Sequence, residues 1–250
     1  MDKKIMIGAG VVVLILLALV LYSSTASRNK SEDVVKSITA QDEMTNHAMP
    51  KDVMGMESKW KTFSGTAPLS VDKSTAAWTG SKSAIATWVD TGSIKFLSGT
   101  VLFENGKIKS AEAVADVNSI TALTTGKGDG QDQLSQHLKS ADFFDAAKFP
   151  TAKLIVLSAT HEREEGGKHY YKFTGEMEIK GVKAPVEFSG YVQYMEDGAK
   201  LTAKLELDRT KWGVNFGSSK LKDAFIKDTF TLDVAVVATM AETMMMEKSN

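Results

Sequence analysis

The chain has 250 residues, enough for one or two domains, and its formal net charge of -1 argues against the basic surface on which nucleic-acid binding usually depends. It contains no cysteine, which excludes disulfide bonds, thiol catalysis and cysteine-ligated zinc. With 43% hydrophobic and 24% charged residues, the remaining composition is that of an ordinary globular protein.

The N-terminal region carries a membrane-length apolar run. Residues 5–22 (IMIGAGVVVLILLALVLY) contain no charge, and a helix of this length spans about 27 Å, close to the hydrocarbon thickness of a bilayer. Lys3 and Lys4 favour a cytoplasmic location for residues 1–4. We therefore expect one transmembrane anchor in the cytoplasmic membrane, with the rest of the chain in the periplasm. Residues 24–26 (STA) offer a small-residue cleavage site, so a removed signal peptide is the alternative.

The anchor is followed by a polar segment and then by strands. Residues 25–68 are rich in Ser, Thr, Lys, Asp and Met, show no sustained period, and are predicted to be a flexible tether. Apolar and polar residues then alternate with period two in several stretches, for example at 171–180, 188–194, 201–207 and 230–238. This alternation predicts an antiparallel β-domain over residues 69–239, and residues 240–250 form a Met-rich tail.

Turn signals support a barrel or a sandwich of about eight strands. Asn105–Gly106 and Gly166–Gly167 fit two-residue hairpin turns, and residues 181–185 (GVKAP) are predicted to turn a third pair. The exception is a short helical insertion near 130–148, where Leu134, His137, Leu138 and Ala141 recur at helical spacing. Phe143 and Phe144 follow this pattern, and Pro150 stops it.

The titratable side chains do not form a catalytic or metal-binding pattern. His161 and His169 flank three glutamates; with a Gly166–Gly167 turn, Glu164 lies opposite His169 and His161 lies opposite Lys172. That register predicts an exposed cross-strand ion pair rather than converging metal ligands. The chain has no G-x-S-x-G elbow, and we expect neither catalysis nor a cofactor.

The inner faces of the strands suggest a lumen. Ala111, Ala113, Ala115 and Val117 share one face of a strand and are small. An eight-stranded barrel is just wide enough to hold a ligand or to be filled by side chains. The candidate ligand-lining residues are the large apolar ones: Trp78, Trp88, Phe96, Phe103, Phe143, Phe144, Met177 and Phe188.

Four ordered motifs carry a resemblance to a known family. They are NSIT at 118–121, HLKSADFFD at 137–145 with KFPT at 148–151, GEMEIKGV at 175–182 with Pro185, and DRTKW at 208–212. The region 76–239 resembles the YceI-like family of bacterial lipid- and polyisoprenoid-binding proteins. Asp90 departs from the pattern, because many members carry a histidine there.

The resemblance implies an extended, lipocalin-like antiparallel barrel that holds one long isoprenoid of the polyprenyl or quinone type. We therefore expect a membrane-anchored, extracytoplasmic protein that stores or transports this lipid. A helix that carries Phe143 and Phe144 would cover one end of the barrel, with one ring on the wall and the other at the cavity. The alternative is a filled barrel that acts as a structural or protein-interaction module of the cell envelope, for example in stress.

Two further features lead to expectations of their own. Arg209 follows the strand at 201–207, and we expect it to bridge a carboxylate or strand carbonyls at the barrel rim. Methionines gather outside the barrel, at 44–56 together with His47 and at 240–246. Because the first and last strands of an up-and-down barrel pair antiparallel, both flanks should leave the same end. Thioethers bind Cu(I), but unstructured flanks are the simpler interpretation.

Overall fold

The structure, a computed structural model, describes residues 63–83, 87–126, 128–195, 198–218 and 226–239. Four predicted segments lie wholly or mostly outside the described residues: the cytoplasmic N-terminus at 1–4, the anchor at 5–22, the tether at 25–68 and the tail at 240–250. Within the described ranges, no helix combines the length and the apolar character needed to cross a membrane.

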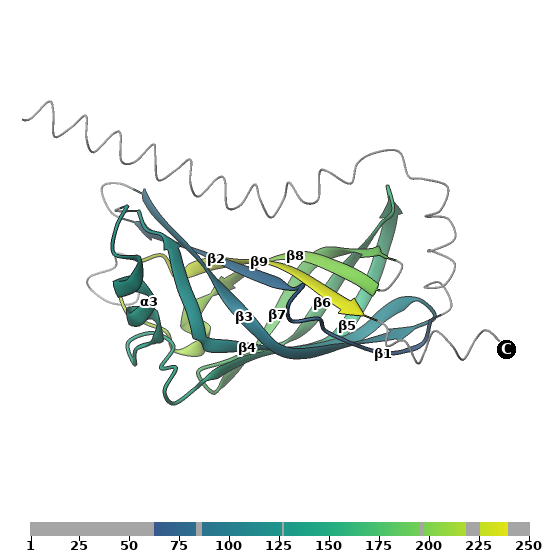
Figure 1. Cartoon of the computed structure of the whole chain (residues 1–250), viewed down its shortest axis with the longest axis horizontal. Helices are drawn as coiled ribbons and strands as arrows, with labels where there is room; N and C mark the ends of the chain where they lie inside the picture. The colour runs from purple at the N-terminus through teal and green to yellow at the C-terminus, as the bar shows by residue number, and fades with distance from the viewer. Residues whose placement is uncertain (1–62, 84–86, 127, 196–197, 219–225, 240–250) are drawn as a thin grey trace, which may run out of the picture.

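The described chain is mainly β (Figure 1). Its elements are β1 (Gly65–Pro68), β2 (Thr75–Ser83), β3 (Thr87–Glu104), β4 (Lys107–Thr124), α3 (Gln131–Lys139), β5 (Thr151–Glu165), β6 (Lys168–Ile179), β7 (Val182–Tyr194), β8 (Gly198–Asp208), the 3-10 helix η1 (Arg209–Trp212) and β9 (Thr229–Thr239). The predicted helical insertion between strands is present as α3.

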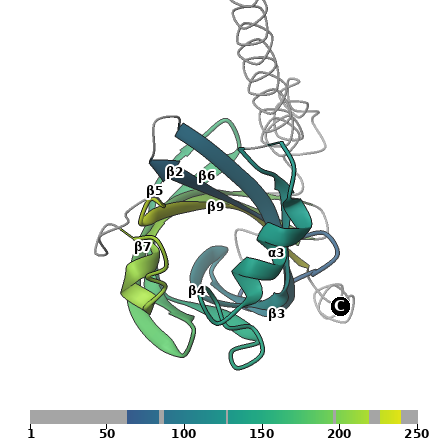
Figure 2. The same ribbon diagram turned by 90° about the vertical axis from the view of Figure 1, so that its left-hand side faces the viewer.

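The strands form one antiparallel sheet that closes into a barrel (Figure 2). Along the sheet the order is β2-β9-β8-β7-β6-β5-β4, and β3 pairs with both β4 and β2, which joins the two edges. Closure gives every one of these strands two neighbours, so their backbone groups find partners within the sheet. The predicted eight-stranded antiparallel barrel is confirmed.

The first strand of the barrel is interrupted. β1 and β2 both run antiparallel to β3, with β1 opposite residues 100–103 and β2 opposite residues 87–94. At the break, Leu69 forms a bridge with Ala238 of β9, and the Ser74 hydroxyl accepts a hydrogen bond from Val237 N at 3.0 Å. The barrel therefore begins before residue 69, inside the range predicted as tether.

Two predicted hairpins have the expected turns. Asn105–Gly106 joins β3 to β4, Gly166–Gly167 joins β5 to β6, and all four residues have positive φ, as this class of turn requires. The third turn is displaced from the prediction. It consists of Lys180–Gly181, and Pro185 already belongs to β7. Pairing of β7 with β8 starts only at Ser189, and proline is tolerated where a strand has an unpaired side.

The register of the β5–β6 hairpin corrects the prediction for its two histidines. Glu164 lies opposite His169 as expected, but His161 lies opposite Tyr171 and not opposite Lys172. The cause is an irregularity between His161 and Arg163, since one extra residue in a strand reverses the face of every residue beyond it. His169 is buried because it shares the inner face of β6 with Tyr171, whereas Glu164 is exposed, so only the glutamate of the predicted ion pair lies at the surface.

The helix lies across one end of the barrel (Figure 2). It is fixed to β4 by Ser135, whose hydroxyl accepts a hydrogen bond from Ala122 N at 2.8 Å. It ends at Lys139, where the Ser140 hydroxyl donates to the carbonyl of His137 at 2.7 Å. Phe143 and Phe144 therefore lie in the turns that follow α3, not on the helix as predicted.

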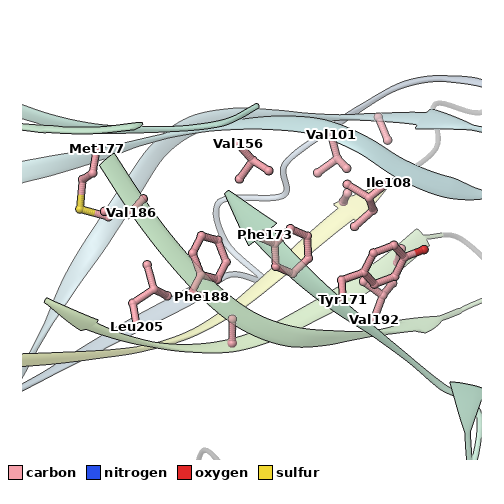
Figure 3. Packing of buried hydrophobic residues seen from close by; sticks show 14 of the residues in the cluster. Val101, Ile108, Val156, Tyr171, Phe173, Met177, Val186, Phe188, Val192 and Leu205 are labelled. Atoms are coloured by element: carbon pink, nitrogen blue, oxygen red, sulfur yellow. The ribbon is translucent and has the colours of Figure 1, made fainter. Parts of the chain in front are cut away.

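Side chains fill the interior toward the β3–β4 hairpin, at the end remote from α3 (Figure 3). The ring of Phe173 lies 5.7 Å from that of Tyr171 and 5.0 Å from that of Phe188, and both pairs are stacked. Phe103 is almost fully buried there and contacts Phe63 at 5.6 Å between ring centres. This half of the barrel is a packed core of the usual kind.

Candidate functional site

The rest of the interior is hollow. A cavity of about 400 Å³ lies between the packed core and α3, which is within the range of small-ligand sites. Strands β2 to β9 all contribute apolar side chains to its wall, among them Ile94, Val117, Leu154, Leu201, Leu205, Leu232 and Val234. The cavity is therefore an apolar lumen whose wall is formed by all the strands of the barrel.

Small residues on β4 create much of this space. Ala111, Ala113 and Ala115 all line the cavity, as their period-two spacing predicts for one face of a strand. In the closed barrel β4 is separated from β8 by three strands on either side, so the alanines face the wall that bears Leu201 and Leu205. An alanine side chain on one wall and a leucine on the other leave space between them, whereas large side chains on both walls would fill it.

Six of the eight predicted lining residues lie on the cavity wall: Trp78, Phe96, Phe143, Phe144, Met177 and Phe188. Trp88 and Phe103 are not among the residues that line it. Trp88 lies near the beginning of β3, where it packs against Gly126, and Phe103 lies near its end, in the packed core. The cavity thus lies beside the middle of β3. The prediction treated every inner-face position of this long strand alike, although the positions near its two ends lie beyond the cavity.

The segment after α3 closes one end of the cavity. Phe143 is buried in a small cluster with Leu138, Val117 and Val214, and its ring centre lies 5.3 Å from that of Phe216. Phe144 is half-buried and contacts both this cluster and the main core. Both rings border the cavity, so the double phenylalanine connects the cover of the barrel to its wall.

Polar groups gather at this same end. Asp90 is buried; one of its carboxylate oxygens accepts a hydrogen bond from Gly126 N at 2.8 Å and the other lies 4.0 Å from Lys82 Nζ. The indole nitrogen of Trp78 is buried and has no hydrogen-bond partner among the described residues. Trp78, Lys82 and Asp90 all border the cavity, so its mainly apolar wall carries a donor and an ion pair at this end.

Arg209 closes the wall beside this end. Its guanidinium donates to the carbonyls of Val214 at 2.7 Å, Lys227 at 3.1 Å and Ile226 at 3.3 Å, and lies 3.5 Å from Asp228. Burial lowers the pKa of Arg209, while Asp228 and Asp208 raise it. The contacts are those expected of an arginine that bridges carbonyls and a carboxylate, and they join η1 to the chain that enters β9.

Several lining residues gave no signal in the sequence. Phe216 and Ile226 border the cavity from an irregular connection between η1 and β9, where neither a period of two nor a period of 3.6 marks an inner face. Lys82 was overlooked because charged residues are expected outside a barrel. By contrast, Leu205 and Leu232 lie on the inner faces of alternating strands and could have been found from their spacing.

Comparison with known proteins agrees with this architecture. A sequence profile described as the YceI-like domain matches residues 68–238, which is more than half of the chain. The chain belongs to the YceI-like family. Curated relatives called Protein YceI, from Escherichia coli O6:H1 and Shigella boydii, are 30% identical to this YceI-like chain over 95 residues. That stretch is 38% of this chain and spans less than half, 44%, of the length of those relatives.

Solved structures resemble this YceI-like protein over the same domain. The crystal structure of Burkholderia cenocepacia BcnA matches with a TM-score of 0.53 and 25% identity, over 68% of this chain and 99% of BcnA. A polyisoprenoid-binding domain from Saccharophagus degradans, implicated in plant cell wall breakdown, matches with a TM-score of 0.53 over 72% of this chain and all of that domain. Its identity of 16% makes it a likeness of fold.

Proposed function

We propose that this protein binds a long-chain isoprenoid lipid in the barrel lumen and stores or transports it. The observation that carries the proposal is the apolar cavity of about 400 Å³ inside the YceI-like barrel. Each CH₂ group that leaves water gains about 0.8 kcal/mol, so a chain of many carbons has a large gross drive into such a space. A bilayer offers nearly the same gain, which keeps the net preference small and allows exchange.

The polar groups at the α3 end favour a ligand with one oxygen-bearing end. The Trp78 indole nitrogen is a donor without a partner in the described part of the chain, and Lys82 and Asp90 lie at the same end. A buried donor is favoured when it finds an acceptor, such as a quinone carbonyl, a phenol or a phosphate oxygen. The fold likeness to a domain named for polyisoprenoid binding is consistent with this class of ligand.

The test is mass spectrometry of organic extracts from the purified full chain, compared among three proteins. Ala113→Phe places a ring in the lumen, whereas Ala77→Phe adds the same ring on β2 at a position that does not line the cavity. We expect about one isoprenoid per barrel in the wild type and in Ala77→Phe, and at least a fivefold reduction in Ala113→Phe with an unchanged β-type circular dichroism spectrum. An empty wild-type extract, or equal lipid in all three, rejects the proposal.

We further infer that residues 5–22 anchor the protein in the cytoplasmic membrane and that the barrel is periplasmic. A flexible tether over residues 25–62 would have a root-mean-square span of roughly 31–37 Å, which keeps the barrel near the bilayer that contains such lipids. Because the chain has no cysteine, Leu157→Cys introduces a single thiol at a site that is 69% exposed. A membrane-impermeant maleimide should label it in cells with a permeabilised outer membrane. Labelling only after lysis would place the barrel in the cytoplasm and refute the proposed orientation.

A further inference from the structure

The apolar lumen has a well-defined floor at the end remote from α3. Val101, Ala111 and Val156 lie directly opposite one another on β3, β4 and β5, and all three line the lumen. The next buried residues of β3 and β4 toward their hairpin, Phe103 and Ile108, do not line it and belong to the packed core. On this wall the floor of the lumen is therefore the row formed by Val101, Ala111 and Val156.

Three aromatic rings in a row form the floor on the wall that contains β6 and β7 (Figure 3). The ring centre of Phe173 lies 5.0 Å from that of Phe188 and 5.7 Å from that of Tyr171, and both pairs are stacked. Phe188 lines the lumen, whereas Phe173 is 1% exposed and does not. Phe188 is therefore the ring that the end of a ligand in the lumen would meet first.

The space beyond the rings does not suit a hydrocarbon chain. A second pocket of about 220 Å³ lies there, and it shares no lining residue with the lumen. Its wall includes the polar or charged side chains of His161, Glu164, His169 and Tyr171. A hydrocarbon chain would remove these groups from water without offering them a hydrogen bond, which is unfavourable. An isoprenoid tail should therefore end at Phe188.

The volume of the lumen limits how much of a chain it can hold. Phe143 and Phe144 border the lumen at the α3 end, so it is bounded at both ends. An engineered apolar cavity of about 150 Å³ holds one benzene molecule with its six carbons, so a cavity of about 400 Å³ has room for roughly 16 carbons. Since an isoprene unit has five carbons, this corresponds to about three units.

We propose that the barrel selects isoprenoids of about three to four isoprene units and that Phe188 sets this limit. The proposal rests on the function proposed above and narrows its ligands to the shorter members of that class. A longer chain must either displace the ring stack or leave its excess units outside the lumen, and units left outside gain nothing from burial. Phe188 is thus a specificity-determining residue, because it contacts the end of the chain.

The experiment measures which chain lengths the protein takes up. The delipidated full chain in detergent is incubated with an equimolar mixture of prenols of three to nine isoprene units, and the bound prenols are extracted and quantified by mass spectrometry. We expect the wild type to bind the three- and four-unit prenols at least fivefold more than the nine-unit prenol. Phe188→Ala frees roughly the space of one benzene ring, so its preferred length should increase by about one unit.

Phe103→Ala is the matched control, because it removes a buried ring that lines neither the lumen nor the polar pocket. It should keep the wild-type distribution of chain lengths. Ala111→Leu raises the floor from the opposite wall and should lower the ratio of the four-unit to the three-unit prenol at least threefold. This variant removes no core side chain, so the test remains decisive if Phe188→Ala does not fold.

The outcomes separate the length limit from lipid binding itself. A wild type that binds no prenol of any length would reject the proposed function, and the length limit with it. A wild type that binds all lengths equally would overturn the length limit alone. A wild-type distribution in both folded floor variants, Phe188→Ala and Ala111→Leu, would likewise show that the floor does not select the chain length, while lipid binding stands.

Discussion

Trp78 lies against Gly92 so closely that a Cβ atom on Gly92 would be 2.4 Å from the indole ring and 1.9 Å from the carbonyl oxygen of Thr121. The two residues are directly opposite each other on β2 and β3. The absence of a side chain at Gly92 is thus what allows the indole to cover the backbone and to form part of the cavity wall.

Gly92→Ala should therefore displace Trp78 and lower the free energy of unfolding by about 1–3 kcal/mol, the usual range for overpacking. Gly80→Ala is the matched control, because it lies on the same strand pair and a Cβ there meets nothing within 4 Å. Urea unfolding followed by tryptophan fluorescence measures both. If the two variants are equally stable, the close packing of Trp78 on Gly92 does not matter for the fold.

Arg209→Lys should lower stability without reducing bound lipid. Lysine cannot reach the carbonyls of Val214, Lys227 and Ile226 together, and each buried carbonyl that loses its donor costs about 1–3 kcal/mol. We expect a loss of about 2–4 kcal/mol in urea unfolding. Arg163→Lys, on the exposed face where Arg163 covers Tyr170 at 3.8 Å, should change stability by less than about 1 kcal/mol. Loss of lipid at unchanged stability would instead make Arg209 a ligand-binding residue.

The interrupted first strand predicts where the domain can be cut. A chain that starts at residue 63 keeps β1 and Phe63, whereas a chain that starts at 69 loses the four pairs between β1 and β3 and exposes Phe103. Loss of the Phe63 side chain alone should lower stability by about 1.5–3 kcal/mol. Thermal unfolding of 63–239 and 69–239 compares them directly. Identical melting temperatures would show that β1 contributes nothing.

The free energy of unfolding should fall at alkaline pH because Tyr171 and Tyr194 are buried. Burial raises the pKa of Tyr171 and Tyr194 in the folded state, so the unfolded chain releases these protons first, near pH 10. The stabilisation is complete below pH 10 and is lost as the pH rises above it, by up to about 1.4 kcal/mol per tyrosine and pH unit.

Denaturant unfolding between pH 8 and pH 11 tests this dependence. In the double variant Tyr171→Phe, Tyr194→Phe the free energy of unfolding should decline less steeply with pH, because neither of these two tyrosine hydroxyls is left to titrate. Tyr170→Phe removes a hydroxyl from the neighbouring position on the other face of β6 and serves as the comparison. A decline as steep in the double variant as in the wild type would assign the alkaline transition to other groups.

The barrel could be predicted because its signals are local. Alternation of apolar and polar residues reports the two faces of a strand wherever the strand lies, and Asn105–Gly106 specifies a two-residue turn by the positive φ of its own residues. The same alternation identified the three alanines of β4 as one face. Local signals failed where a residue is inserted: the irregularity after His161 placed this histidine opposite Tyr171 instead of Lys172.

By itself, the sequence determined the strands, most of the turns, the helical insertion and the class of fold. Only the tertiary structure decided that one half of the barrel is packed and the other hollow. The volume of a lumen is the space inside eight strands minus the volume of the side chains that all of them contribute. It therefore cannot be predicted from the sequence of any single strand. For the same reason Trp88 and Phe103 have inner-face positions but border no cavity, while Phe216 and Ile226 reach it from a connection without any period.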